Sequence, residues 1–167
     1  MKVLETSRLN VRRMKPDDAA FMLRLLNNPS WLNFIGDRGV RTLEDARRYI
    51  ENGPMGSYER FGFGFYIVEL KDDGTPIGMC GLAQRDYLDA PDIGYALMPE
   101  FAGHGYAFEA AAGVLDYART ALRLPRMLAT TRTDNASSSR VLEKLGMRHV
   151  GMVNATDVGR ELMLYRI

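Results

Sequence analysis

The order of apolar and polar positions along the chain predicts alternating strands and helices. Segment 7–14 places Leu9 and Val11 between polar residues, a period of two that is typical of a half-buried strand. Pro16, followed by two aspartates, predicts the first turn of a helix, because proline and acidic side chains suit the free amides there. The Asn-Asn-Pro sequence at 27–29 is expected to end that helix.

A second helix is predicted to begin at Thr42, because Asp45 stands three positions later and completes a variant of the capping box. Gly53-Pro54 is expected to stop this helix. Two apolar runs, 62–70 and 76–84, then flank an Asp-Asp-Gly-Thr turn, which predicts a β-hairpin.

The second half of the chain continues the alternation. A third strand is predicted over 92–98, followed by a glycine-rich loop and a helix over 106–122. Segment 126–131 indicates another strand, a short helix follows Asn135, and two strands near 147–153 and 160–167 finish the chain. Because no repeat or linker interrupts this order, we expect a single α/β domain over residues 1–167, with helices inserted between the strands of a mixed sheet.

Length and composition agree with such a domain and exclude several classes of protein. The 167 residues are 46% hydrophobic and 26% charged, as in an ordinary globular protein. The 22 Lys+Arg and 21 Asp+Glu leave a net charge of +1, which disfavours a nucleic-acid binder. The single cysteine excludes a disulfide framework and a multi-cysteine zinc site. With no signal peptide and no membrane-spanning apolar run, we expect a cytoplasmic protein with no membrane partner and no metal.

Two segments carry ligand-binding signals. Gly103 and Gly105 permit a sharp turn before a helix, and the free amides and dipole of such a helix start favour a phosphate or pyrophosphate. The same G-x-G pattern also occurs in turns that only start a helix. In the second segment, the polar residues that follow Thr133 predict a helix cap, and Arg140 and Lys144 are expected on one exposed face of that helix.

Together the two segments resemble the GNAT superfamily of acetyl-CoA-dependent N-acetyltransferases. DIGYALMPEFAGHGYAFEA at 92–110 resembles its acyl-CoA signature, and NASSSRVLEKLGM at 135–147 resembles its second motif. The opening ETSRLNVRRMKPDDA at 5–19 is similar to the RimJ/RimL-like branch. The resemblance covers almost the whole chain. It implies an α/β (α+β) fold with a mixed, mostly antiparallel sheet, a splayed parallel strand pair and helices on both faces.

The resemblance also implies which residues hold acetyl-CoA. Strand backbone would pair with the pantetheine arm, loop amides would hold the pyrophosphate, and the second motif would contact the cofactor arm. These positions are Tyr95, Ala96 and Leu97 in the strand, Gly103, His104, Gly105, Tyr106, Ala107 and Phe108 in the loop, and Asn135 and Ser138 in the second motif. Two positions depart from the family pattern: Ala102 replaces a larger side chain in the loop, and Leu142 stands where many relatives carry a tyrosine that serves as general acid.

The implied reaction is direct attack of a neutral amine on the acetyl thioester, which requires a base and a proton donor. Asp92, acting through water, is the candidate base, and an exposed strand-end carboxylate is the alternative interpretation. Ser138 is the candidate proton donor, and a helix cap or cofactor contact is the alternative. Cys80 is expected to be a buried core thiol. His104 and His149 are expected to be structural or solvated rather than catalytic.

The first two helices and their 28–62 connection, which carries Trp31, Phe34 and Tyr58, are expected to build the acceptor pocket. Asp89 and Glu161 are candidates for recognising a cationic acceptor. The resemblance implies an amine acceptor, either a protein amino terminus or a small molecule, and we expect a monomer or a homodimer. The alternative function is a catalytically silent module that binds acetyl-CoA for sensing or assembly.

Overall fold

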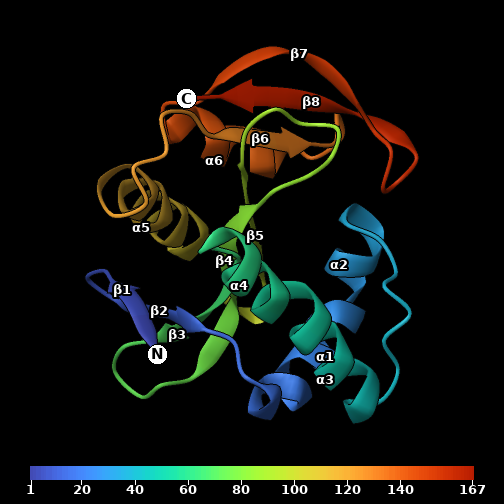
Figure 1. The fold of residues 1–167 in the computed structure, drawn as a ribbon, viewed down its shortest axis with the longest axis vertical. Coiled ribbons are helices and arrows are strands. Elements are labelled where there is room, and N and C mark those ends of the chain that lie inside the picture. The colour runs from blue at the N-terminus through green and yellow to red at the C-terminus, as the bar shows by residue number, and fades with distance from the viewer.

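A computed structural model describes residues 1–167 and contains one eight-stranded sheet with helices packed on both faces (Figure 1). The strands lie in the order β1-β2-β3-β4-β5-β6-β8-β7. The strands are β1 (Lys2–Glu5), β2 (Leu9–Arg13), β3 (Phe65–Leu70), β4 (Pro76–Ala83), β5 (Asp92–Leu97), β6 (Leu128–Thr131), β7 (Arg148–Ala155) and β8 (Arg160–Arg166). The helical segments are η1 (Pro16–Asp18), α1 (Ala19–Asn27), α2 (Pro29–Phe34), α3 (Leu43–Ile50), η2 (Glu51–Met55), α4 (Gly56–Phe61), η3 (Pro99–Phe101), α5 (Tyr106–Thr120) and α6 (Ala136–Lys144).

The sheet is antiparallel except where β5 and β6 run side by side in parallel. These two strands pair at a single position, Asp92 with Leu128, where the Leu128 N–H donates to the Pro91 carbonyl at 2.9 Å. Beyond this point the strands diverge, and their backbone groups no longer meet. The expected mixed sheet with a splayed parallel pair is confirmed, and the splay opens a slot in the middle of the sheet.

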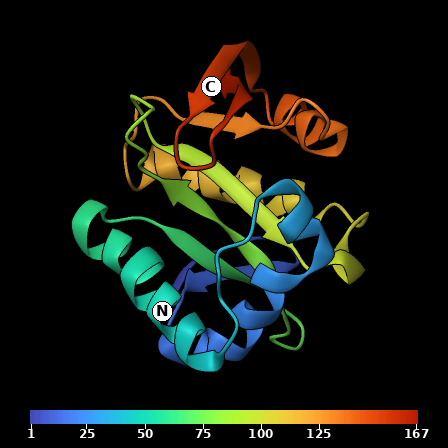
Figure 2. The same ribbon diagram turned by 90° about the vertical axis from the view of Figure 1, so that its right-hand side faces the viewer.

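The two faces of the sheet are covered by different helices (Figure 2). Helix α5 packs on one face, where Ala110 and Val114 join the buried side chains of Val68, Cys80 and Ile93. Helices α1 and α3 cover the other face over Ile67 and Met79, together with Trp31 from α2. Successive side chains along each strand therefore point alternately into one hydrophobic core and the other, as expected for a sheet buried on both sides. No helix is long and apolar enough to cross a membrane.

Local signals explain most of the elements. The hairpin formed by β3 and β4 is confirmed, as is the capping box at Thr42, whose hydroxyl accepts from the Asp45 N–H at 3.0 Å. Gly146 follows α6 with a φ of +90°, the left-handed conformation that commonly ends a helix. Arg140 and Lys144 are exposed on α6, as expected.

One expected boundary was wrong, and two elements, α2 and β1, were not expected. The Asn28-Pro29 pair ends α1 but also begins α2, because the Asn28 side chain accepts from the Trp31 N–H at 3.0 Å. Gly53-Pro54 does not stop the second helix: the π-helical segment η2 carries the chain past Pro54 into α4. A widened turn tolerates the missing N–H and the ring of proline. Strand β1 was not expected, since its four residues gain their conformation from pairing with β2.

Candidate functional site

The slot between β5 and β6 opens into a pocket of about 990 Å³ that extends from the glycine loop to helices α2, α3 and α4. All the cofactor-binding residues expected from the sequence line this pocket except His104, and Asp92 and Ser138 line it as well. The structure therefore brings the two sequence segments together on one cavity. Which of these residues bind a cofactor stays a prediction.

The glycine loop presents an uninterrupted row of free amides. Gly103 and Gly105 both have a φ of +80°, a conformation that glycine adopts without strain. None of the backbone N–H groups from Gly103 to Phe108 donates a hydrogen bond within the chain, and the first that does is that of Glu109, to the Gly105 carbonyl at 3.0 Å. Such a row at the start of a 15-residue helix is a ready anion site.

Arg8, the residue before β2, holds the glycine loop in place. Arg8 donates from Nη1 to the His104 carbonyl at 3.0 Å and from Nε to Glu109 at 2.7 Å, and its guanidinium lies 4.4 Å from the centre of the Tyr106 ring. The His104 ring lies against Tyr106 and outside the pocket. The structural role expected for this histidine is thus supported, and its side chain is not positioned to hold a ligand in the pocket.

The second segment combines a helix cap with a hydroxyl pair. The Asn135 side chain accepts from the Ser138 N–H at 3.2 Å and caps α6. The Ser138 Oγ lies 3.2 Å from the Tyr95 hydroxyl, which reaches across from β5. Burial raises the pKa of Tyr95 to about 12, so this phenol keeps its proton at neutral pH. Leu142 is 1% exposed and packs in the core. The hydroxyl groups at the slot therefore come from Tyr95 and Ser138, and not from position 142, where many relatives carry a tyrosine.

Asp92 is buried where β5 and β6 separate. Its side chain is 4% exposed, so the alternative of an exposed strand-end carboxylate was wrong. Arg85 approaches its two carboxylate oxygens with Nε at 3.2 and 3.4 Å, and donates from Nη1 to Asp157 at 2.8 Å. Burial raises the pKa of Asp92 to about 6, although the charge of Arg85 opposes that rise. A carboxyl with such a pKa can accept a proton near neutral pH.

Arg85 was missed in the sequence, although one signal for it existed. The hairpin of β4 and β5 pairs Ala83 with Asp92, so a residue just after the end of β4 must lie close to the start of β5. Asp157 had no such signal, because it comes from the turn between β7 and β8. That turn lies on the same side of the sheet as α2 (Figure 2).

The remaining candidate nucleophile and base have structural positions. Cys80 is fully buried, and burial raises the pKa of its thiol. His149 lies outside the pocket on β7, where its Nε2 is 2.9 Å from the Gly151 carbonyl oxygen and its ring lies against Tyr165. No group of three or more His, Cys, Asp or Glu side chains lies close enough together to hold a metal ion.

Substitution of Cys80 by Ala should leave the rate of the reaction expected from the sequence unchanged per folded molecule, because the thiol cannot reach the pocket as a thiolate. We expect only a loss of roughly 1 kcal/mol in the free energy of unfolding, from the buried sulfur atom that is removed. Denaturant unfolding and initial rates on the same preparation check this. A rate loss in excess of the unfolded fraction would assign the thiol a chemical role.

The far end of the pocket, beside Asp92, differs from the expectation. Trp31 and Phe34 line the pocket as expected, but Tyr58 stacks on Tyr66 beneath it and accepts from the Met14 N–H at 3.0 Å. Neither Asp89 nor Glu161 lines it. Asp89 instead pairs with Arg126 on the surface at 2.6 Å. The expectation that these two acids recognise a cationic acceptor was therefore wrong.

Comparison with known proteins identifies the same architecture. The family model described as "Acetyltransferase (GNAT) domain" matches residues 8–148. The uncharacterized N-acetyltransferase YoaA of Bacillus subtilis is 31% identical over 154 residues, covering 90% of this chain and 85% of that protein.

Solved structures extend the similarity to the whole fold. A GNAT-family acetyltransferase from Bacillus anthracis has 26% sequence identity and a TM-score of 0.81, with coverage of 98% of this chain and 96% of the other. RimL, a ribosomal alpha-N-protein acetyltransferase solved in complex with coenzyme A, has 17% identity and a TM-score of 0.84, covering 100% of this chain and 97% of the other. At that identity the likeness concerns the fold alone.

Proposed function

The chain belongs to the GNAT acetyltransferase family, and from this premise we propose that it transfers an acetyl group from acetyl-CoA to a primary amine by direct attack in a ternary complex. The observation that carries the proposal is the row of free amides from Gly103 to Phe108 at the mouth of the β5–β6 slot. These N–H groups fit a pyrophosphate, because several hydrogen-bond donors and the positive end of the helix dipole meet at one anion site.

Acetyl-CoA, when bound, supplies the reactive thioester. The backbone of Tyr95, Ala96 and Leu97 would hold the pantetheine arm as an added strand, since β6 diverges from β5 and leaves these groups without a partner on that side. Asn135 and Ser138 face the same slot from α6. These contacts would orient the carbonyl carbon toward an amine entering from the side of α2 and α4.

Asp92 acts as the base and takes the proton of the attacking amine through water. An α-amino group has a pKa of about 7.7–8.0, so a useful fraction is already neutral at pH 7 and a base of modest strength suffices. On the other side of β5, Ser138 gives a proton to the departing thiolate, and Tyr95 resupplies that proton across their 3.2 Å contact. The transfer needs no acyl-enzyme, in keeping with the inaccessible Cys80 thiol.

A silent acetyl-CoA-binding module is the second candidate, and Leu142 favours it because the usual tyrosine is missing at that position. Measurement of thiol release from acetyl-CoA over a panel of small amines and amino-terminal peptides separates the two. Acceptor-dependent release supports the enzyme. Tight binding of acetyl-CoA, with no release for any acceptor, would support the silent module.

Substitution of Ser138 by Ala should lower kcat about tenfold while it changes the Kd for acetyl-CoA much less, because the variant removes a proton donor rather than a phosphate contact. Ser139→Ala is the matched control on the same helix, since Ser139 does not line the pocket. Tyr95→Phe should lower kcat in the same direction by a smaller factor. An unchanged kcat in Ser138→Ala would remove this serine from the mechanism.

A further inference from the structure

Positive charge gathers around the pocket although the chain as a whole is nearly neutral. The charged side chains that line it are Arg38, Arg60, Arg85, Arg132, Arg140, Lys144 and Arg160, against only two acids, Asp92 and Asp157. With a net charge of +1 for the whole chain, this is a local excess that the sequence composition does not reveal.

Two of these cations belong to the phosphate end. Arg140 and Lys144 project from α6, and the Lys144 ammonium lies 4.4 Å from the ring centre of Phe108 in the glycine loop. They are therefore placed for the phosphates of the proposed co-substrate. Two others are already paired with acids: Arg85 with Asp92 and Asp157, and Arg132 with Asp134.

Arg38, Arg60 and Arg160 have no carboxylate within 4 Å. Arg60 is the residue before the last of α4. Three residues after this helix, the Gly64 carbonyl accepts from the Leu82 N–H, and Leu82 pairs with Ile93 of β5. Arg160 stands three residues after Asp157, which Arg85 links to Asp92. These two lie at the Asp92 end of β5, whose six residues span about 20 Å from Asp92 to the glycine loop.

Arg38 lies in the loop between α2 and α3, and it lines the pocket together with Phe34 of α2 and Tyr49 of α3. Arg85 lines the same pocket from the loop after β4. The loop before α3 and the loop after β4 therefore present cations to one pocket.

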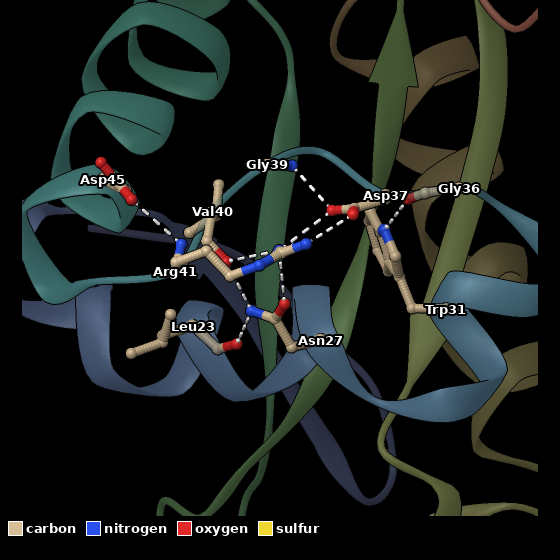
Figure 3. A network of polar contacts seen from close by, with 9 residues as sticks. All are labelled: Leu23, Asn27, Trp31, Gly36, Asp37, Gly39, Val40, Arg41 and Asp45. Carbon is tan, nitrogen blue, oxygen red and sulfur yellow. Dashed lines mark hydrogen bonds and ion pairs between the residues drawn. The ribbon is translucent and has the colours of Figure 1, made fainter.

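The segment that carries Arg38 is held by a polar network (Figure 3). Arg41 donates from Nη1 to Asp37 and to Asn27 at 3.0 Å each, and Asp37 also accepts from the Gly39 N–H at 2.8 Å. On the other side, the Trp31 Nε1 donates to the Gly36 carbonyl at 2.9 Å. The neighbours of Arg38 thus have their partners within the loop, while Arg38 itself remains without one at the pocket.

We propose that the acceptor is an amine whose molecule also carries a negative charge, a carboxylate in the first place, which Arg38, Arg60 and Arg160 bind at the Asp92 end of the pocket. This inference rests on the proposed acetyl transfer. The arginines attract the anion and disfavour a second positive charge, and they also favour the neutral form of the attacking amine. A polyamine or a lysine-rich amino terminus would be repelled there.

The test compares acceptors that differ chiefly in charge, by thiol release at fixed saturating acetyl-CoA. Each kcat/KM is expressed per neutral amine, so that differences in the pKa of the amines do not enter the comparison. One arm pairs free amino acids with their carboxamides, and a second pairs tripeptides that have aspartate or lysine after the same first residue. We expect kcat/KM to be at least about tenfold higher for the anionic member in one arm or both, because a charge-assisted contact is worth about that factor. The arm with the larger ratio identifies a small molecule or an acidic peptide as the source of the carboxylate.

Arg38→Gln, Arg60→Gln and Arg160→Gln should each reduce this charge preference several-fold, mainly through KM. Arg47→Gln is the matched control, because Arg47 is an exposed arginine on α3 outside the pocket. Equal or higher rates for the neutral or cationic members overturn the inference and leave the transferase proposal standing, and so does a preference that survives in all three variants. No release with any acceptor would contradict the proposed function, and this inference with it.

Discussion

Replacing Asp92 with Asn is expected to lower kcat/KM for the amine by about 100- to 1000-fold, with little change in the Kd for acetyl-CoA. General-base catalysis by a positioned carboxylate supplies a factor of this size. The side chain stays the same shape, and its position at the point where β5 and β6 separate is fixed by the backbone pairing with Leu128. Arg85 keeps its second carboxylate partner, Asp157, so its guanidinium still has an ion pair in the variant.

The pH dependence of the wild-type rate tests the role of Asp92 as the base by an independent measurement. Because burial raises the pKa of Asp92 to about 6, the carboxyl is protonated below that pH and cannot take a proton. The rate should therefore fall as the pH decreases through about 6, and this limb should vanish in Asp92→Asn. Asp86→Asn is the control, because Asp86 is an exposed acid in the β4–β5 connection outside the pocket. This variant should keep both the rate and its decrease at low pH. A full rate in Asp92→Asn would exclude the carboxylate as the base.

Substitution of Gly103 by Val should weaken acetyl-CoA binding about 30- to 100-fold. Gly103 has a φ of +80° and open space around its Cα, and a branched side chain disfavours this φ and fills the volume next to the free amides. The loop would have to turn its N–H groups away from the phosphate, at a cost of about 2–3 kcal/mol for that loss of affinity.

Gly74→Val separates this effect from general strain. Gly74 lies in the turn between β3 and β4, has a φ of +74° and is equally open, but it is remote from the pocket. Both variants should lose similar amounts of stability, whereas only Gly103→Val should lose affinity for acetyl-CoA. Calorimetric titration with acetyl-CoA and thermal unfolding of both variants provide the comparison. Equal affinity in Gly103→Val and the wild type would show that this loop does not hold the pyrophosphate.

The sequence predicted those parts of the fold that local chemistry determines. The strands around the Asp-Gly turn, the helix capped by Thr42 and the helix ended by Gly146 each depend on a few adjacent residues. Helix α2 and strand β1 were missed because no motif of adjacent residues is sufficient to indicate them. Asn28 both follows one helix and caps the next, and β1 exists through its pairing with β2.

The parts of the candidate site that were predicted are likewise those that depend on residues close together in the sequence. The glycine loop and the segment after Asn135 were visible as motifs, since their function depends on backbone groups within one stretch of chain. The contacts of Asp92 were not visible, because Arg85 and Asp157 come from two other connections of the sheet. The cation-rich end of the pocket combines residues from α4, two loops and β8, so it emerges only from the fold.

The most direct test of acetyl transfer in a ternary complex is intact-mass spectrometry of the full chain, combined with thiol detection, before and after an amine is added. With acetyl-CoA alone, we predict no acetyl group on the protein and no free thiol. Addition of the best acceptor of the panel should release one thiol for each acetylated amine, while the protein mass stays unchanged. An acetylated protein before the amine is added, or bound acetyl-CoA that no amine consumes, would contradict this account.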